Sequence, residues 1–222
     1  MSAAEALSLA SNAGTVSALW LAPSAPTACY VFAHGAGAGM THPFMAAFAA
    51  GLAQRRMATL RYQFPYMEKK SGRPDPPAVC HATVRAAVAA AAKRAPTLQL
   101  IAGGKSFGGR MTSQAQASEP LEGVKGLAFL GFPLHAAGKP TSARAAHLSQ
   151  IKIPMLFLQG EKDKLAQAEL LKPLITELGP KATLLWAPQA DHSFHVPKRS
   201  GRTDEQIMGM LLDAFAAWAD KI

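Results

Sequence analysis

The residues best suited to chemistry are a serine, an aspartate and a histidine that occur in that order along the chain. Ser106 lies in Gly104-Lys105-Ser106-Phe107-Gly108, a G-x-S-x-G pattern between a strand-like run and a helix-like run. In such a turn the glycines avoid clashes and leave the hydroxyl exposed beyond the strand. Because a serine hydroxyl is a weak nucleophile at neutral pH, it needs a base and an acid that orients the base.

Two later segments supply the candidate base and acid. His192 and His195 follow the last predicted strand, and we favour His192 because it comes sooner after that strand. Asp163 follows an earlier predicted strand and is the preferred acid, with Glu161 as the alternative. Nucleophile, acid and base follow one another in this order in hydrolases with a nucleophile turn. Ser106, Asp163 and His192 therefore predict a catalytic triad.

A second glycine-rich turn, His34-Gly35-Ala36-Gly37-Ala38-Gly39, follows an early predicted strand. In serine hydrolases such a turn supplies one N–H group of the oxyanion hole, and the residue after the nucleophile supplies the other. We therefore expect the backbone N–H groups of Ala36 and Phe107 to form the oxyanion hole. His34 is expected to anchor the turn.

Nucleotide-binding motifs compete for the same glycines and fit them poorly. A P-loop ending at Ser106 would need a glycine at position 99, where Gln99 lies within a predicted strand. A dinucleotide fingerprint counted from Gly35 would need a third glycine where Met40 stands, and Arg61 occupies the place of the ribose-binding acid. Both alternatives are disfavoured.

The elements that must position these residues alternate between strand-length and helix-length apolar runs, which is typical of a mostly parallel sheet covered by helices. An antiparallel hairpin with a turn at 11–14 is expected first, at one edge of the sheet. The predicted strands are 7–10, 15–22, 27–33, 58–62, 98–102, 126–131, 154–159 and 182–187. The predicted helices are 43–55, 77–94, 107–118, 166–177 and 203–221. The segment between 131 and 154 has room for one short helix and for no cap domain.

Composition places the chain among globular proteins. With 222 residues, 49% of them hydrophobic and 17% charged, residues 1–222 are expected to form a single α/β domain. The net charge of +9 comes from scattered basic residues without interleaved aromatic platforms, so nucleic-acid binding is disfavoured. Cys29 and Cys80 lack ligand spacing and are expected to be buried free thiols. Neither a secretory signal nor a membrane span is indicated, and we expect a cytoplasmic protein.

The motifs together resemble the small α/β hydrolases related to dienelactone hydrolase, in the branch that includes the testis-expressed hydrolase-like proteins. The resemblance covers nearly the whole chain and rests on residues 34–39, Phe64-Pro65-Tyr66-Met67, 104–111 and 191–194. It implies an eight-stranded α/β-hydrolase sheet without a cap domain, and a triad at the three positions argued above. Dienelactone hydrolase has a cysteine nucleophile where this chain has Ser106, so lactone specificity is not carried over.

The expected activity is cleavage of a small-molecule carboxylic ester or thioester through an acyl-enzyme, with no cofactor and no metal. An inactive hydrolase-like binding or scaffold protein is the alternative. Arg110, one helical turn after Ser106, is suited either to an anionic substrate group or to a surface role. No sequence feature indicates an oligomeric state. The side chains expected to line an open substrate pocket are Met40, Phe44, Phe64, Tyr66, Phe107, Phe132 and Phe194.

Overall fold

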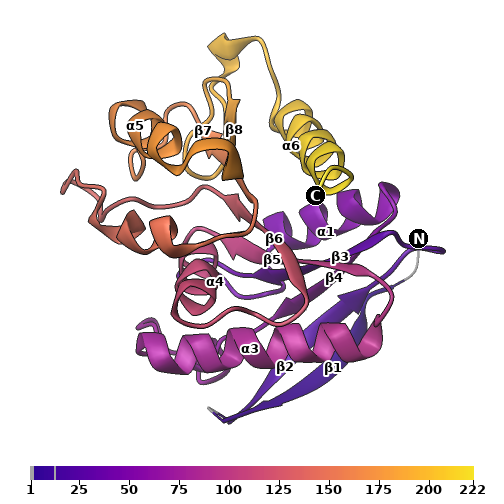
Figure 1. Ribbon diagram of the computed structural model, residues 1–222. Helices are drawn as coiled ribbons and strands as arrows, with labels where there is room; N and C mark the ends of the chain where they lie inside the picture. The colour runs from indigo at the N-terminus through magenta and orange to yellow at the C-terminus, as the bar shows by residue number, and fades with distance from the viewer. Residues whose placement is uncertain (1–2, 13) are drawn as a thin grey trace.

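The computed structural model describes residues 3–12 and 14–222. Its strands form one eight-stranded sheet in the order β1-β2-β4-β3-β5-β6-β7-β8 (Figure 1). The strands are β1 (Glu5–Ser11), β2 (Gly14–Leu21), β3 (Ala28–Ala33), β4 (Met57–Tyr62), β5 (Gln99–Lys105), β6 (Val124–Leu130), β7 (Met155–Gly160) and β8 (Ala182–Ala187). This confirms the predicted α/β-hydrolase fold.

The sheet is antiparallel at one edge and parallel elsewhere. β1 pairs with β2, and β2 with β4, in antiparallel register, whereas the pairs from β4 through β3 to β8 are parallel. The predicted edge hairpin is therefore confirmed, although position 13 of its expected turn lies outside the described residues. Because the parallel strands end at one edge of the sheet, the segments that follow β5, β7 and β8 meet there.

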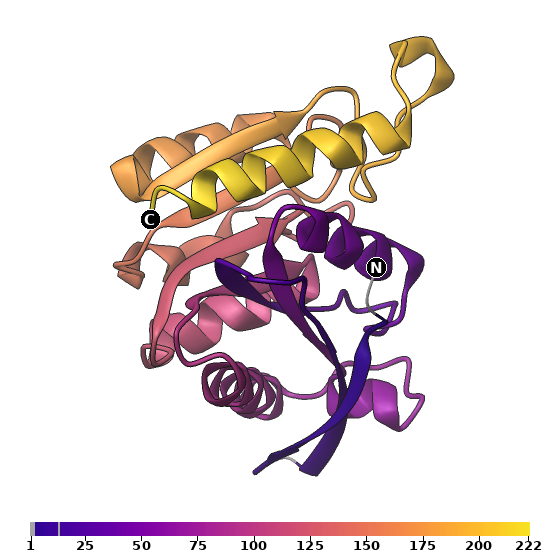
Figure 2. The same ribbon diagram turned by 90° about the vertical axis from the view of Figure 1, so that its right-hand side faces the viewer.

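Helices cover both faces of the sheet (Figures 1 and 2). The α-helices are α1 (Pro43–Gln54), α2 (Pro65–Glu68), α3 (Pro77–Arg94), α4 (Phe107–Ser118), α5 (Ala168–Leu178) and α6 (Asp204–Ala219). Short 3₁₀ segments occur at Ala143–Gln150, Gly179–Lys181 and Lys198–Ser200. The first of these is the short helix expected between residues 131 and 154, whereas the four-residue α2 was not predicted.

Local sequence explains where several helices begin. Proline occupies the start of α1, α2 and α3, where its fixed φ suits a helix and its missing N–H costs no hydrogen bond. Helix α6 begins with a capping box between Thr203 and Gln206. The first turns of these helices are thus specified locally, before any contact with the sheet.

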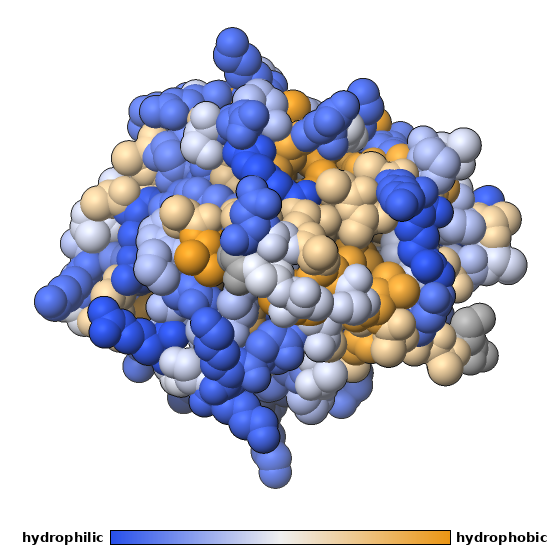
Figure 3. All heavy atoms as spheres, turned by 90° about the horizontal axis from the view of Figure 1, so that it is seen from below, coloured by the Kyte–Doolittle hydropathy of each residue, from blue (hydrophilic) through white to orange (hydrophobic). Residues whose placement is uncertain are grey.

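The two faces of the sheet bury separate apolar clusters. On one face, α1 and α6 pack Phe48 and Phe215 against Tyr30 and Phe32 of β3. On the other, α3, α4 and α5 cover a larger cluster that includes both cysteines as buried free thiols, as expected. On the outer surface, the view in Figure 3 shows hydrophilic side chains around apolar side chains that are exposed between them. Burial of both faces explains why the central strands are apolar at nearly every position.

The boundary of β5 differs from the prediction, which ended this strand at residue 102. The strand continues through Gly103 and Gly104 to Lys105. A β-carbon at Gly103 would lie 1.8 Å from the carbonyl oxygen of Ala128, so the glycine permits the neighbouring strand β6 to approach closely. Gly104, the first glycine of the G-x-S-x-G pattern, therefore belongs to the strand.

Gly103→Ala should destabilise the protein by about 2–4 kcal/mol, because the backbone of β6 cannot yield to the new methyl group. Gly209→Ala is the matched control: its β-carbon would meet nothing within 4 Å on helix α6, and alanine should stabilise this helix by up to about 1 kcal/mol. Urea denaturation of both variants checks the prediction. Equal midpoints for Gly103→Ala and the parent chain would contradict the assigned contact between β5 and β6.

Candidate active site

Ser106 lies in a tight turn between β5 and α4. Its backbone has φ +50° and ψ −114°, a strained conformation for a residue with a side chain. β-carbons at Gly104 and Gly108 would lie 2.5 Å from the carbonyl oxygens of Ala33 and His34, respectively. Only glycine permits this close contact between the turn and the end of β3. The contact fixes the serine beside the glycine-rich segment that follows β3.

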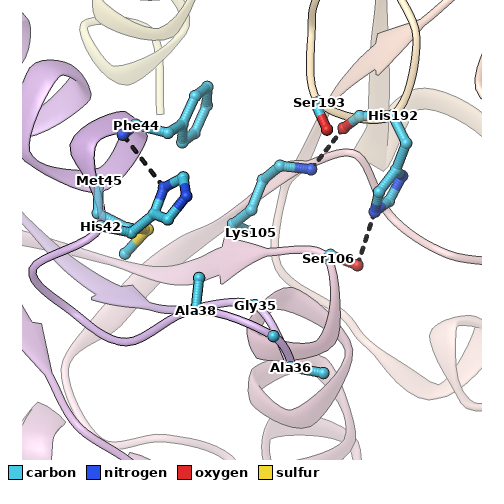
Figure 4. Close-up of a pocket in the computed structure, with 11 residues that line it drawn as sticks. Gly35, Ala36, Ala38, His42, Phe44, Met45, Lys105, Ser106, His192 and Ser193 are labelled. Atoms are coloured by element: carbon cyan, nitrogen blue, oxygen red, sulfur yellow. Dashed lines mark hydrogen bonds between the residues drawn. The ribbon is translucent and has the colours of Figure 1, made fainter.

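A continuous chain of hydrogen bonds joins Ser106, His192 and Asp163. The Oγ atom of Ser106 lies 2.8 Å from Nε2 of His192, and Nδ1 of His192 lies 2.6 Å from Oδ2 of Asp163 (Figure 4 shows the first of these bonds). An ionised carboxylate only accepts hydrogen bonds, so Nδ1 carries the proton and Nε2 presents a lone pair. The serine hydroxyl then donates its proton toward Nε2, as general base catalysis requires.

The carboxylate of Asp163 is fixed by further donors. Its side chain is fully buried, and Oδ1 accepts a 2.8 Å hydrogen bond from the N–H of Leu165. Oδ2 also accepts a 2.5 Å bond from the amide of Gln159, whose own oxygen accepts from the N–H of Phe132. Gln159 was not predicted as a site residue. Its signal in the sequence is a lone polar side chain at the end of an apolar strand.

Lys105 holds the loop that carries His192. Its Nζ atom donates a 2.6 Å hydrogen bond to the carbonyl oxygen of His192 (Figure 4). The same atom lies 5.2 Å from the centre of the Phe194 ring. Burial lowers the pKa of Lys105 to about 8, against the opposing effect of Asp163 and Asp191. This role was not predicted either, because Lys105 reaches a loop far away in sequence.

The two alternative residues lie outside the hydrogen-bonded chain. Nδ1 of His195 lies 2.8 Å from Oδ2 of Asp204, and the His195 side chain is 66% exposed. Glu161 accepts hydrogen bonds from the backbone and side chain of Gln189. The structure thus brings Asp163 and His192 together with Ser106, and places Glu161 and His195 in separate surface contacts.

The glycine-rich turn after β3 is held by His34. Its Nδ1 donates a 2.8 Å hydrogen bond to the carbonyl oxygen of Gly35, and its Nε2 accepts a 3.0 Å bond from the N–H of Phe64. Because the C=O and N–H groups of a trans peptide point in opposite directions, the N–H of Ala36 points away from His34. Tyr66 adds a 3.0 Å bond from its hydroxyl to the carbonyl oxygen of Ala36.

The second expected oxyanion donor belongs to α4. Phe107 is the first residue of this helix, where backbone N–H groups have no partner within the helix. The positive end of the helix dipole lies at the same place and favours negative charge. The N–H groups of Ala36 and Phe107 thus come from the two segments that flank Ser106.

Two cavities share Ser106 and Ala36 as lining residues. The first, of about 310 Å³, contains the imidazole of His192 (Figure 4) and is lined by Gly35, Ala36, Gly37, Ala38, His42, Phe44, Met45, Lys105, Ser106, His192 and Ser193. The second, of about 520 Å³, includes Phe107, Arg110, Arg144 and Asp75 in its lining. Ser106 is therefore accessible from two sides.

The aromatic side chains expected in the pocket are distributed differently. Phe44 lines the first cavity and Phe107 the second, as predicted. The other expected side chains are buried and line neither cavity, because they fill the core beneath the site: Met40, Phe64, Tyr66, Phe132 and Phe194. Among these, Phe194 stacks on Phe44 from the inside and so supports the wall of the first cavity.

Within residues 3–12 and 14–222, no group of three His, Cys, Asp or Glu side chains is arranged to hold a metal ion. No helix in this described part of the chain combines the length and apolar character needed to cross a bilayer.

Acid should destabilise the protein through His34. Burial lowers its pKa to about 4, from the ordinary value of 6.5. Between these values the unfolded chain binds the proton and the folded chain does not, so stability falls as the pH decreases from about 6.5 to 4. This histidine alone should contribute roughly 3 kcal/mol to that loss.

Urea denaturation between pH 7 and 4 measures the effect, and His34→Gln should flatten the pH dependence. His195→Gln is a control of opposite sign. The hydrogen bond to Asp204 raises the pKa of His195, so this group favours folding at low pH, and removing it should not flatten the acid decline. An unchanged slope in His34→Gln would contradict the assigned neutral state of His34.

Comparison with known proteins agrees with this architecture. An α/β serine hydrolase without a lid from Xanthomonas campestris superimposes with a TM-score of 0.75 at 21% identity, over 98% of this chain and 96% of that one. A dienelactone hydrolase from Anabaena variabilis superimposes with a TM-score of 0.76 at 19% identity, over 97% of this chain and 95% of that one. An esterase domain from Rhodothermus marinus superimposes with a TM-score of 0.75 at 16% identity, over 99% of each chain. The alpha/beta hydrolase domain family matches residues 26–220, and the chain therefore belongs to the α/β-hydrolase family.

Proposed function

We propose that the protein is a serine hydrolase that cleaves a carboxylic ester or thioester of a small molecule through an acyl-enzyme on Ser106. The observation that carries this proposal is the hydrogen-bonded chain from Asp163 through Nδ1 and Nε2 of His192 to Oγ of Ser106. A serine hydroxyl is activated when it is hydrogen-bonded to a base that is itself hydrogen-bonded to an acid.

In the acylation step, Oγ of Ser106 bonds to the substrate carbonyl carbon while its proton passes to Nε2 of His192. The carbonyl oxygen takes the displaced electron pair and becomes an oxyanion. The bond from carbon to the leaving oxygen or sulfur then breaks, and Nε2 gives its proton to the leaving atom. Asp163 remains ionised throughout and stabilises the imidazolium that exists between the two proton transfers.

The oxyanion would accept hydrogen bonds from the backbone N–H groups of Ala36 and Phe107. These donors need no reorganisation during the reaction, because His34 holds the preceding carbonyl and α4 holds Phe107. Loss of one such donor typically lowers kcat by about 10²–10³-fold. The packing of His34 thus contributes to catalysis through the position of the Ala36 amide.

In the deacylation step, a water molecule replaces the alcohol or thiol. His192 accepts a proton from the water, and the resulting hydroxide attacks the acyl carbon. Collapse of the second tetrahedral intermediate breaks the bond to Oγ, which recovers its proton from His192. The products are a carboxylic acid and an alcohol or thiol, and the enzyme returns to its starting state.

A fluorophosphonate probe should label the protein at Ser106, because it reacts with activated serines. Intact-mass analysis should show one adduct on the parent chain and none on Ser106→Ala. Turnover of short p-nitrophenyl esters should fall by about 10⁴-fold or more in that variant. Ser193→Ala is the matched control, since this serine lines the same cavity outside the hydrogen-bonded chain. A folded parent chain with neither labelling nor turnover would favour a binding or scaffold protein.

The assignment of acid and base can be tested with paired substitutions. Asp163→Asn should lower kcat by about 10³–10⁴-fold, because the amide would favour the wrong tautomer of His192. Glu161→Gln changes a neighbouring carboxylate in the same way and should leave kcat within about twofold, because the Glu161 carboxylate accepts hydrogen bonds from Gln189, away from Ser106 and His192. His192→Gln and His195→Gln form the corresponding pair for the base. A larger loss in Glu161→Gln or His195→Gln would overturn the assignment.

A further inference from the structure

The second cavity beside Ser106 has two arginines and one aspartate in its lining. Its lining includes Ser106 and Phe107 at one end, together with Arg110 and Arg144. Arg110 follows Ser106 by one turn of α4, and its N–H bonds to the carbonyl oxygen of Ser106 at 3.1 Å. The serine and the arginine therefore lie on the same cavity, one turn of α4 apart along the backbone.

The guanidinium group of Arg110 has spare hydrogen-bonding capacity. Its Nε atom is buried and has no hydrogen-bond partner among the described residues. Its central carbon lies 5.5 Å from the centre of the Phe107 ring, which holds the group over the helix. Within the described part of the chain, neither Arg110 nor Arg144 forms an ion pair with a carboxylate. Both guanidinium groups are therefore available to pair with an anionic group in the cavity.

The other ionisable groups near the cavity leave a net positive charge. Asp75 is the carboxylate in the lining, and its Oδ2 accepts a hydrogen bond from the N–H of Tyr66. His147 stays neutral near pH 7, because burial and then Arg110 lower its pKa to about 4. Burial and the charge of Arg144 also lower the pKa of Arg110. Two guanidinium groups opposed by one carboxylate would be balanced by a ligand with a single negative charge.

Three histidines complete the surroundings. His135 lines the cavity, and its two ring nitrogens already bond to the carbonyl oxygen of Ala136 and to Oε1 of Gln167. Burial lowers the pKa of His81, and the nearby Arg85 and Arg110 lower it further. Nε2 of His147 is hydrogen-bonded to the Ser113 hydroxyl. The two arginines are therefore the groups in this lining that are free to pair with an anion.

The position of His192 determines which part of the substrate each cavity receives. His192 must give its proton to the leaving atom, so the leaving group has to lie on the side of the imidazole. His192 lines the first cavity and is absent from the lining of the second. The leaving alcohol or thiol therefore belongs in the first cavity, and the acyl chain extends from Ser106 into the second.

We propose that the preferred substrates are esters or thioesters of short dicarboxylic acids, with the free carboxylate of the acyl group paired to Arg110 and Arg144. Guanidinium groups suit this role because they can donate two parallel hydrogen bonds to a carboxylate. The inference rests on the proposed function of Ser106 and adds to it the chemical class and orientation of the substrate. Arg110 and Arg144 are substrate-binding residues in this assignment.

Three esters with matched acyl lengths test the proposal in a pH-stat assay: monoethyl glutarate, ethyl pentanoate and carboxymethyl pentanoate. Monoethyl glutarate carries a carboxylate on its acyl group, and carboxymethyl pentanoate carries one on its leaving group. Ethyl pentanoate is uncharged. The kcat/KM for monoethyl glutarate should exceed that for ethyl pentanoate by about 10–100-fold, as expected for hydrogen bonds to a charged group. Carboxymethyl pentanoate should show no such advantage.

Arg110→Gln and Arg144→Gln should each reduce the ratio of the first two kcat/KM values toward one. Lys139→Gln is the matched control, because it also removes one positive charge from the segment between β6 and β7. Lys139 is exposed and does not line the cavity. This control should retain the parent ratio. Because both kcat/KM values are measured on the same preparation of each variant, their ratio reports selectivity and does not change with the fraction of folded protein.

Equal kcat/KM values for glutarate and pentanoate in the parent chain, or an undiminished ratio in both arginine variants, would overturn the inference. A preference for carboxymethyl pentanoate would overturn the assigned orientation. Free glutarate should also slow fluorophosphonate labelling of the parent chain more than that of Arg110→Gln. If Ser106 is labelled but the enzyme does not prefer monoethyl glutarate over ethyl pentanoate, the inference alone fails. If Ser106 is neither labelled nor active on any ester, the proposed function fails with it.

Discussion

The contact between the end of β3 and the turn after β5 determines the geometry of the whole site. The carbonyl oxygens of Ala33 and His34 lie where β-carbons would stand on Gly104 and Gly108. This close approach places Ser106 next to the segment that begins at Gly35, so one contact fixes both the serine hydroxyl and the Ala36 amide. The strained backbone of Ser106 is compatible with this arrangement because parallel strands on both sides of β5 hold the turn.

The buried charges of the site are stabilised by specific partners. An isolated carboxylate in the interior would be strongly unfavourable, but Asp163 accepts hydrogen bonds from Gln159, Leu165 and His192. The ammonium group of Lys105 is likewise bonded to the carbonyl oxygen of His192 and lies near aromatic rings. The same bonds hold the Asp163 carboxylate and the loop that carries His192 in place. One hydrogen-bond network therefore compensates for the desolvation of these charges and also orients the side chains.

Local sequence patterns predicted the parts of the structure that depend on local chemistry. The alternation of apolar runs gave the strands and helices, and the two glycine-rich turns indicated where Ser106 and Ala36 would lie. Proline and glycine signals have more than one cause, however. The predicted strand ended at residue 102, but Gly103 belongs to β5, where it is required because β6 passes so close. A single sequence does not reveal which neighbouring strand demands a glycine.

Roles that depend on tertiary contacts were not predictable in the same way. Gln159 and Lys105 act on groups that other strands and loops bring to them, and Arg144 reaches the cavity from the short 3₁₀ segment at Ala143–Gln150. Aromatic residues near the motifs were expected to line the pocket, yet Phe64 and Phe132 fill the core. Burial of an aromatic side chain stabilises the fold wherever space exists, so proximity in sequence to a catalytic motif does not decide its position.

We expect the hydrogen-bonded serine and the two backbone amides to form one preorganised site. A crystal structure of the protein after reaction with a small fluorophosphonate is the decisive experiment, because the adduct mimics the tetrahedral intermediate. It should show a covalent bond from phosphorus to Oγ of Ser106, with the phosphoryl oxygen within about 3.1 Å of the N–H groups of both Ala36 and Phe107. A phosphoryl oxygen directed away from both amides, or an adduct on another residue, would contradict this expectation.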